Sequence, residues 1–198
     1  MDKIKKKRIF ILGFILTIII LTIISFYFDA QIVSSVSKIR SSVLDNFFIG
    51  ITFISLELII FLLLTFLFLL HKKKRKHLLP LWIGLALVSL INFILKLLIQ
   101  RQRPYQLDIV SIVPILEKAS HLTWNSSMPS FHAMLVFYAL PILEKEFPKA
   151  RYFWIVFAFL VAFSRVYFGL HFLSDIIVGA VLGYLIGYLV AKRMKLLK

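Results

Sequence analysis

Long apolar runs recur along the whole chain and leave little sequence for a water-soluble core. The 198 residues are 61% hydrophobic with a mean hydropathy of +0.93, whereas soluble domains are nearer half apolar. A helix that spans a bilayer needs about 20 apolar residues. Segments of this kind lie at roughly 9–28, 47–70, 78–99, 129–143, 152–170 and 172–191. We therefore expect an all-α integral membrane protein with six transmembrane helices in a single domain, residues 1–198.

Positive charge is distributed unevenly between the loops. If the N-terminus is cytoplasmic, the inner segments hold 17 Lys and Arg residues and the outer segments hold six. The inner segments are 1–8, 71–77, 144–151 and 192–198. The positive-inside rule thus predicts that both termini lie inside, with the basic runs touching anionic lipid. No basic and aromatic groove accompanies these runs, so a nucleic-acid partner is not expected despite the net charge of +15.

Two polar intervals fall on the outer side of this topology. The first, 29–46, carries aliphatic residues at helical spacing, which predicts an amphipathic helix on the outer surface, with a packed connector as the alternative. These residues are Ile32, Val36, Ile39 and Val43. The second interval, 100–128, is long enough to cover a site, and we interpret its His121 as a loop residue rather than a catalyst.

Two features within the hydrophobic segments concern helix packing. Glu57 lies inside the second segment, where a carboxylate is either functional or paired, and we favour a packing role. Gly179, Gly183 and Gly187 recur every fourth residue in the last segment. This pattern predicts close packing against another helix, with a dimer contact as the alternative.

Three short polar clusters interrupt the apolar sequence where helices meet the outer face. Ionisable groups so close to a membrane core are functional candidates by default. The clusters are Lys96 with Arg103 and Pro104; Pro129, Ser130, Phe131 and His132; and Ser164, Arg165, His171 and Asp175. Together they supply cations, imidazoles, a hydroxyl and a carboxylate, which can bind and cleave a phosphate without a metal.

The second cluster is typical of an anion site. Pro129 is expected to open a helix, because proline is favoured in the first turn. The N–H groups of Ser130, Phe131 and His132 would then be unpaired and would face an anion. The Ser130 hydroxyl adds a donor, and His132 could give a proton to a leaving oxygen.

The third cluster supplies a nucleophile and its partner. His171 and Asp175 are four residues apart and share one helix face, so the carboxylate can fix the tautomer of the ring. Arg165 offers a planar fork to phosphoryl oxygens. Metal binding by His132, His171 and Asp175 is the competing hypothesis. We disfavour it because the nearby cations would repel a metal, and the chain has no cysteine to ligate one.

The spacing of the clusters resembles the three signatures of the type 2 phosphatidic acid phosphatase family, whose superfamily includes acid phosphatases and vanadium haloperoxidases. Six residues separate Lys96 from Arg103, and all three signatures lie within residues 96–175. One position departs from the family pattern, because Phe131 stands where the family usually has glycine. Its backbone N–H can still donate to phosphate, whereas its ring would narrow the pocket, touch a lipid chain or pack elsewhere. If the glycine of the family needs a positive φ at this position, phenylalanine would strain the backbone there.

The resemblance implies a role for each residue. His171 would attack phosphorus and form a phosphohistidine, Asp175 would orient it, and His132 would protonate the leaving group and later activate water. The phosphate-binding residues would be Lys96, Arg103, Ser130, Phe131 through its N–H, and Arg165. No metal or other cofactor is implied.

We conclude that the sequence predicts a membrane-embedded lipid phosphatase of the plasma (inner) membrane, with its site on the periplasmic or extracellular side. A membrane lipid from the outer leaflet would be the substrate. The candidates are a polyprenyl diphosphate, phosphatidylglycerol phosphate, phosphatidic acid and a lipid A phosphate. We favour the carrier-lipid diphosphate (undecaprenyl diphosphate), because it must be dephosphorylated at that face. A headgroup phosphotransferase with the same intermediate is the alternative, and a non-enzymatic transporter is the weaker one.

Overall fold

The computed structural model describes residues 3–113, 115–116 and 126–194, and throughout this part the regular elements are helical. His121 and most of the second half of the 100–128 interval lie outside the described residues. The longer helices are α1 (Lys3–Ser37), α2 (Ser42–Ile54), α3 (Glu57–Leu69), α4 (Leu78–Ile99), α6 (Phe131–Glu146), α7 (Arg151–Tyr167) and α8 (Leu173–Arg193). Short 3-10 helices join them at η1 (Lys72–His77), η2 (Pro104–Leu107) and η3 (Pro148–Ala150).

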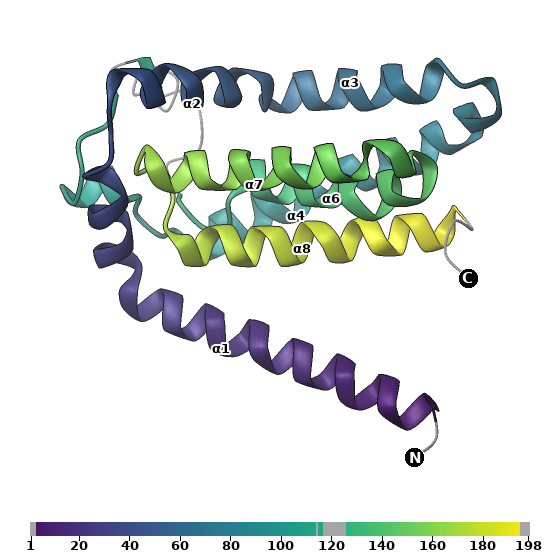
Figure 1. Ribbon diagram of the computed structural model, residues 1–198, viewed down its shortest axis with the longest axis horizontal. Coiled ribbons are helices and arrows are strands. Elements are labelled where there is room, and N and C mark those ends of the chain that lie inside the picture. Colours follow the sequence, from purple (N-terminus) through teal and green to yellow (C-terminus); the bar gives the residue numbers. More distant parts are fainter. Residues whose placement is uncertain (1–2, 114, 117–125, 195–198) are drawn as a thin grey trace.

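The bundle is formed by α4, α6, α7 and α8, with α2 and α3 running along one side of it (Figure 1). Its apolar core is buried between α3, α4, α6 and α7, where Leu64, Val88, Tyr138 and Trp154 are in the same cluster. The first half of α1 leads away from the bundle (Figure 1), and Leu12, Leu16, Ile19 and Ile20 on it are exposed. Helices suit an apolar solvent because each satisfies its own backbone hydrogen bonds.

The predicted all-α membrane protein is confirmed, whereas the number of spans is not settled by helix length. Within the described residues, four helical stretches are long and apolar enough to cross a membrane, and the pair α2 and α3 would make a fifth. The four stretches are 16–37, 72–107, 148–167 and 173–193. Helix α6 has 16 residues, which at about 1.5 Å each is shorter than the hydrocarbon thickness of a bilayer.

The segment predicted as one helix over 47–70 is two helices bent by 60°, so that prediction is wrong in detail. The break has a local cause. The Ser55 hydroxyl donates to the Thr52 carbonyl at 3.0 Å, and Leu56 leaves the helical region with ψ of 141°. A serine that bonds back to a helix carbonyl competes with the helical ladder and bends it. Glu57 then opens α3, where a carboxylate is favoured by the helix dipole.

No separate amphipathic helix lies over 29–46, and this prediction is also wrong. Residues 29–37 are the last turns of α1, and α2 begins at Ser42 after a cap by the Ser41 hydroxyl. The helical spacing is present, but its first half is turned inward, whereas Ile39 and Val43 are exposed. Ile32 and Val36 pack against a buried cluster of α6, α7 and α8 residues. The interval is therefore the packed connector that we considered as the alternative.

The glycine repeat of α8 is a seam against α6, as the packing interpretation predicted. Gly179, Gly183 and Gly187 are separated by one turn each, and a Cβ at any of them would collide with backbone of α6. At Gly179 the atom it would meet is the Ser130 carbonyl oxygen, at 2.6 Å. Small residues allow two helices to approach closely. The seam thus sets the distance between the start of α6 and the start of α8.

We expect Gly183→Ala to destabilise the protein by about 1–3 kcal/mol, the usual cost of overpacking a filled interface. The added methyl group would meet the Met134 backbone, which cannot move without shifting α6. Gly50→Ala is the control, because nothing lies within 4 Å of the corresponding Cβ. Thermal unfolding in detergent would measure both variants. Equal midpoints for the two would contradict the proposed role of the seam.

The two ends of the bundle are chemically different. Both chain termini lie at one end, together with η1 (Figure 1). At this end Glu146 forms an ion pair with Lys74 at 3.3 Å, and His77 Nε2 lies 3.5 Å from its other carboxylate oxygen. The last turns of α4 and α7 and the first turns of α6 and α8 meet at the opposite end. All three predicted polar clusters lie in those turns or directly beside them.

Candidate active site

His171 and Asp175 form a buried pair at the start of α8. His171 is 4% exposed, and its Nδ1 lies 3.7 Å from Asp175 Oδ2. Two other donors hold the same carboxylate oxygen: the Phe172 N–H at 2.8 Å and the Ser127 hydroxyl, which also lies 3.5 Å from His171 Nδ1. Since Nδ1 faces the carboxylate side, Nε2 is the nitrogen left for chemistry.

Burial lowers the pKa of His171 to about 3, an effect that the hydrogen bond to Asp175 opposes and that Arg103 and Lys96 reinforce. The imidazole is therefore uncharged at physiological pH. An uncharged ring has a free lone pair on Nε2, which a nucleophile requires. The same cations that suppress protonation of the ring would attract an anionic substrate towards it.

Three cations of the predicted clusters are buried at the same end of the bundle as this pair. Lys96 donates to the Ser126 carbonyl at 2.7 Å, Arg103 to the Leu170 carbonyl at 3.3 Å, and Arg165 to the Thr52 hydroxyl. All three are less than 10% exposed. In the part of the chain that the structure describes, Lys96 and Arg165 form no ion pair. A buried charge without a counter-ion is costly, and an anionic ligand would offset that cost.

The start of α6 differs from the prediction in one respect. The helix begins at Phe131 with Ser130 as its N-cap, so Pro129 lies outside it rather than opening it. The Ser130 N–H is not free either, because it donates to the Asp175 carbonyl at 3.2 Å. No side chain caps this helix end. The unpaired N–H groups of the first turn are therefore those of Phe131, His132 and Ala133.

Phe131 takes an ordinary helical conformation. Positive φ occurs, among described non-glycine residues, only at Gln100 and Asp108, so the ring causes no strain in place of glycine. The ring is partly buried and packs against the apolar core of the bundle. Of the three positions considered for it, packing against other side chains is the one observed.

Two polar atoms at this helix start are buried and have no hydrogen-bond partner among the described residues. They are Ser130 Oγ and His132 Nε2. Buried polar atoms are nearly always bonded, so an unsatisfied pair beside three cations needs an explanation. A phosphoryl group between them would accept from the hydroxyl and place a leaving oxygen near the imidazole.

Glu57 faces this site, although we predicted a packing role for it. Its Oε1 lies 4.0 Å from His132 Nδ1, and its side chain is 42% exposed. The helix break places the carboxylate there, since α3 begins at Glu57. The carboxylate therefore lies beside the imidazole, where α3 meets α6.

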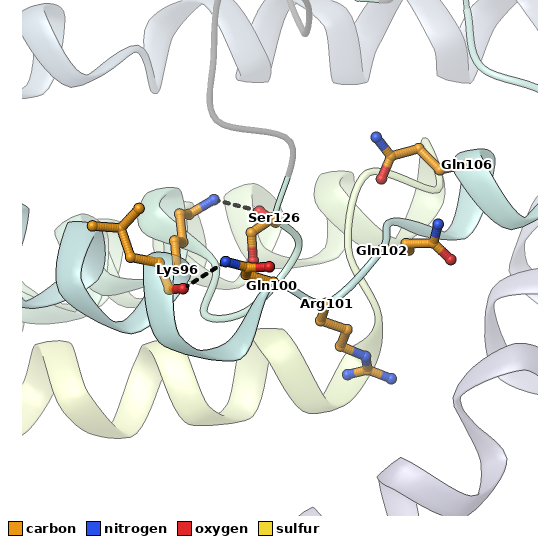
Figure 2. Close-up of a pocket in the computed structure, with 7 residues that line it drawn as sticks. Lys96, Gln100, Arg101, Gln102, Gln106 and Ser126 are labelled. Atoms are coloured by element: carbon orange, nitrogen blue, oxygen red, sulfur yellow. Dashed lines mark hydrogen bonds between the residues drawn. The ribbon is translucent and has the colours of Figure 1, made fainter.

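A pocket of about 430 Å³ opens beside Lys96 (Figure 2). Among the predicted site residues that the structure describes, Lys96 alone lines it. The remaining lining is mostly amide and guanidinium groups, from Leu97, Gln100, Arg101, Gln102, Gln106 and Ser126. A pocket with this lining can hold water or the polar part of a substrate.

The sequence did not reveal several residues of the site. Asn92 lies one turn before Lys96 and donates to the Pro129 carbonyl at 3.1 Å, which holds the α6 start against α4. Thr52 and Ser127 contact Arg165 and Asp175. Asn92 had a usable signal, a polar residue four positions before Lys96 in an apolar helix. Thr52 and Ser127 had none, because Thr52 is an uncharged residue within an apolar run and Ser127 occurs among other small polar residues.

A sequence model described as the PAP2 superfamily matches residues 77–197, more than half of the chain. The chain belongs to the PAP2 superfamily. The resemblance to type 2 phosphatidic acid phosphatases is thereby confirmed, and the protein is a metal-independent membrane lipid phosphatase by class. No curated protein sequence matches it.

Two solved structures share the fold of this PAP2 protein. One is the first transmembrane PAP2-type phosphatidylglycerolphosphate phosphatase from Bacillus subtilis, with a TM-score of 0.70 and 25% identity over 92% of this chain and 96% of that one. The other is Aquifex aeolicus LpxE, with a TM-score of 0.68 and 25% identity over 83% of this chain and 94% of that one. Both likenesses extend beyond the family match into the N-terminal helices.

Proposed function

We propose that this PAP2 protein hydrolyses a phosphomonoester or diphosphate of a membrane lipid through a phosphohistidine intermediate. The observation that carries the proposal is the pair of unpartnered buried atoms, Ser130 Oγ and His132 Nε2, beside three buried cations and the His171–Asp175 pair. This arrangement combines hydrogen-bond donors, positive charge and a neutral imidazole. An anion would satisfy all three.

In the first step, the lone pair of His171 Nε2 forms a bond to phosphorus while the bond from phosphorus to the lipid oxygen breaks. His132 gives its proton to that oxygen, so that the lipid leaves as an alcohol or a phosphomonoester. Lys96, Arg103 and Arg165 stabilise the charge on the transferring phosphoryl oxygens. Asp175 stabilises the positive charge that His171 acquires.

In the second step, His132 acts as a base. It takes a proton from water as the water oxygen bonds to phosphorus, and the bond from phosphorus to His171 breaks. Inorganic phosphate leaves, and both histidines return to their starting states. Because the same residue gives and takes the proton, each cycle balances without a metal or another cofactor.

We propose that both termini are cytoplasmic and the site faces outside, with six spans that include the bent α2–α3 pair and the short α6. The basic residues of η1 and the last turn of α8 lie at the same end as the termini (Figure 1), and positive charge favours the cytoplasmic side. The site is at the other end, where a lipid from the outer leaflet could reach it.

The proposed substrate classes can be ranked by one assay. Purified protein in detergent would be given phosphatidylglycerol phosphate, undecaprenyl diphosphate and phosphatidic acid, with phosphate release measured in the presence of EDTA. The Bacillus subtilis structure supports the first as a candidate. We expect release from at least one lipid, unaffected by EDTA. An activity that EDTA removes and zinc restores would contradict the mechanism.

Headgroup transfer is an outcome of the same assay. If water resolves the intermediate, free phosphate equals the lipid consumed. If lipid is consumed in the presence of an added alcohol and no phosphate is released, the phosphoryl group has passed to the alcohol. The protein is then a phosphotransferase rather than a hydrolase. Lipid that is neither hydrolysed nor transferred by folded protein would overturn the proposed function.

A further inference from the structure

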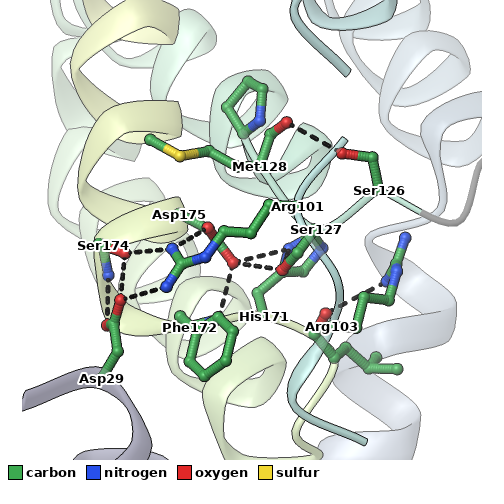
Figure 3. A network of polar contacts seen from close by, with 12 residues as sticks. Asp29, Arg101, Arg103, Ser126, Ser127, Met128, His171, Phe172, Ser174 and Asp175 are labelled. Atoms are coloured by element: carbon green, nitrogen blue, oxygen red, sulfur yellow. Dashed lines mark hydrogen bonds and ion pairs between the residues drawn. The ribbon is translucent and has the colours of Figure 1, made fainter. Parts of the chain in front are cut away.

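Arg101 lies at the centre of a polar network that no part of the proposed chemistry uses (Figure 3). Its Nη1 donates to Asp175 Oδ1 at 2.7 Å and to the Ser174 hydroxyl at 2.6 Å. Its Nη2 donates to Asp29 Oδ2 at 2.7 Å. The faces of the guanidinium are covered by the rings of Phe172, at 4.1 Å, and Phe26, at 5.0 Å.

This arrangement differs from that of the phosphate-binding cations. Arg101 is only two residues from Arg103, so its position alone would suggest another ligand for phosphate. Both terminal nitrogens of Arg101, however, already donate to carboxylates. A guanidinium held by two carboxylates and stacked between aromatic rings is fixed in place and has no charge to spare for a substrate.

Asp29 completes the network from α1. It is 3% exposed, and besides Arg101 it accepts from the Ser174 N–H at 3.1 Å and from the Ser174 hydroxyl. The matched family region begins at residue 77, so Asp29 lies outside it. A buried carboxylate at this point of a membrane helix is costly unless it is paired. Here its partner Arg101 also binds Asp175, the residue that is proposed to orient His171.

The two oxygens of Asp175 have separate partners. Oδ2 faces His171, Ser127 and the Phe172 N–H, whereas Oδ1 is bonded to Arg101. A carboxylate bonded through both oxygens cannot rotate about its χ2 torsion without losing one set of bonds. Arg101 thereby holds the plane in which Oδ2 meets the His171 ring. Asp29 in turn holds Arg101 in the orientation that reaches Oδ1.

We propose that Arg101 and Asp29 are positioning residues for the His171–Asp175 pair, which makes α1 part of the catalytic machinery. The inference rests on the proposed roles of His171 and Asp175. It predicts an effect on turnover and not on phosphate affinity, because neither residue is directed at the phosphoryl group. A misplacement of reacting groups by about 1 Å costs roughly 100-fold in rate.

The test uses the full-length protein with Asp29→Asn and Arg101→Lys, and with Asp108→Asn as a matched carboxylate-to-amide control. Asp108 is exposed and seven residues from Arg101, and its left-handed backbone accommodates asparagine. For each variant we would measure kcat and KM on a lipid that the wild type hydrolyses. Competitive inhibition by inorganic phosphate and the thermal midpoint in detergent would be measured alongside.

We expect Asp29→Asn to lower kcat by about 10- to 100-fold with the phosphate inhibition constant within about twofold of wild type. Arg101→Lys keeps the positive charge but loses the planar guanidinium that binds both carboxylates. Its kcat should therefore fall as well, again without weaker phosphate inhibition. Asp108→Asn should match wild type. This split between turnover and anion binding is what a residue that only supports the fold would not produce.

Two results would overturn the inference. One is a wild-type kcat in Asp29→Asn. The other is a parallel loss of turnover, phosphate inhibition and thermal midpoint in both variants, which would mean that the network only holds the helices together. Failure of the proposed function is a separate observation, because it would appear as no phosphate release by the wild type.

Discussion

Replacing His171 with alanine is expected to lower phosphate release by at least about 10⁴-fold while the protein stays folded. The variant loses the nitrogen that bonds to phosphorus, and no neighbouring group can replace it. Among the described residues, His132 lacks a buried carboxylate of the kind that Asp175 provides, since the carboxylate that it meets, Glu57, is 4.0 Å away and half-exposed. Lys96, Arg103 and Arg165 would still bind the substrate phosphate, so the affinity for inorganic phosphate should persist.

The measurement is phosphate release under single-turnover and steady-state conditions, with phosphate inhibition and thermal midpoint recorded on the same sample. His71→Ala is a suitable control, because His71 is an exposed histidine next to η1 at the opposite end of the bundle. Turnover by His171→Ala within tenfold of wild type would exclude His171 as the nucleophile. It would return His132 or an activated water to consideration.

Replacing His132 with glutamine is expected to slow lipid hydrolysis by about 10²–10⁴-fold, the usual range for removing a general acid or base. With p-nitrophenyl phosphate as the substrate, the rate of the first step, formation of the phosphoenzyme, should fall far less. Its nitrophenolate leaves without a proton, so the acid is not needed. The second step still lacks its base, because no group would deprotonate the attacking water. The phosphoenzyme should therefore accumulate.

This outcome has a direct signature. A burst of nitrophenolate equal to the amount of enzyme should precede a slow steady state, and ³²P from labelled substrate should remain on the protein in an acid-labile form. His171→Ala should show neither the burst nor the label. Equal losses of His132→Gln with lipid and with the nitrophenyl ester, and no trapped phosphate, would contradict an acid–base role for His132.

The sequence alone indicated which polar residues of the three clusters would gather at one end of the helices, whereas their catalytic and binding roles stay predictions. Lys96, Arg103, Ser130, His132, Arg165, His171 and Asp175 meet at one end of the bundle. These could be predicted because their signal is local. An ionisable residue within an apolar run stands out against its neighbours, and fixed spacings place such residues on one helix face or at one helix end.

Helix ends and breaks were harder to predict from the sequence. The 47–70 run is predominantly apolar on both sides of the break, so hydropathy could not show the bend that brings Glu57 to His132. Similarly, the aliphatic spacing in 29–46 was recognised, but it does not state whether the apolar face meets lipid or protein. Lipid tails and a protein core are equally apolar, so only the positions of the neighbouring helices distinguish them.

What the sequence alone determined is therefore the helical membrane class and the chemical content of the site, since both follow from hydropathy and spacing along the chain. The tertiary structure decided how the polar groups pair. Asp29, Arg101 and Asp175 are 72 and 74 residues apart, and no local pattern links them. Their pairing depends on the crossing of α1 past α8, which is set by side-chain packing between helices. Buried hydrogen bonds form only after that packing brings their partners within reach.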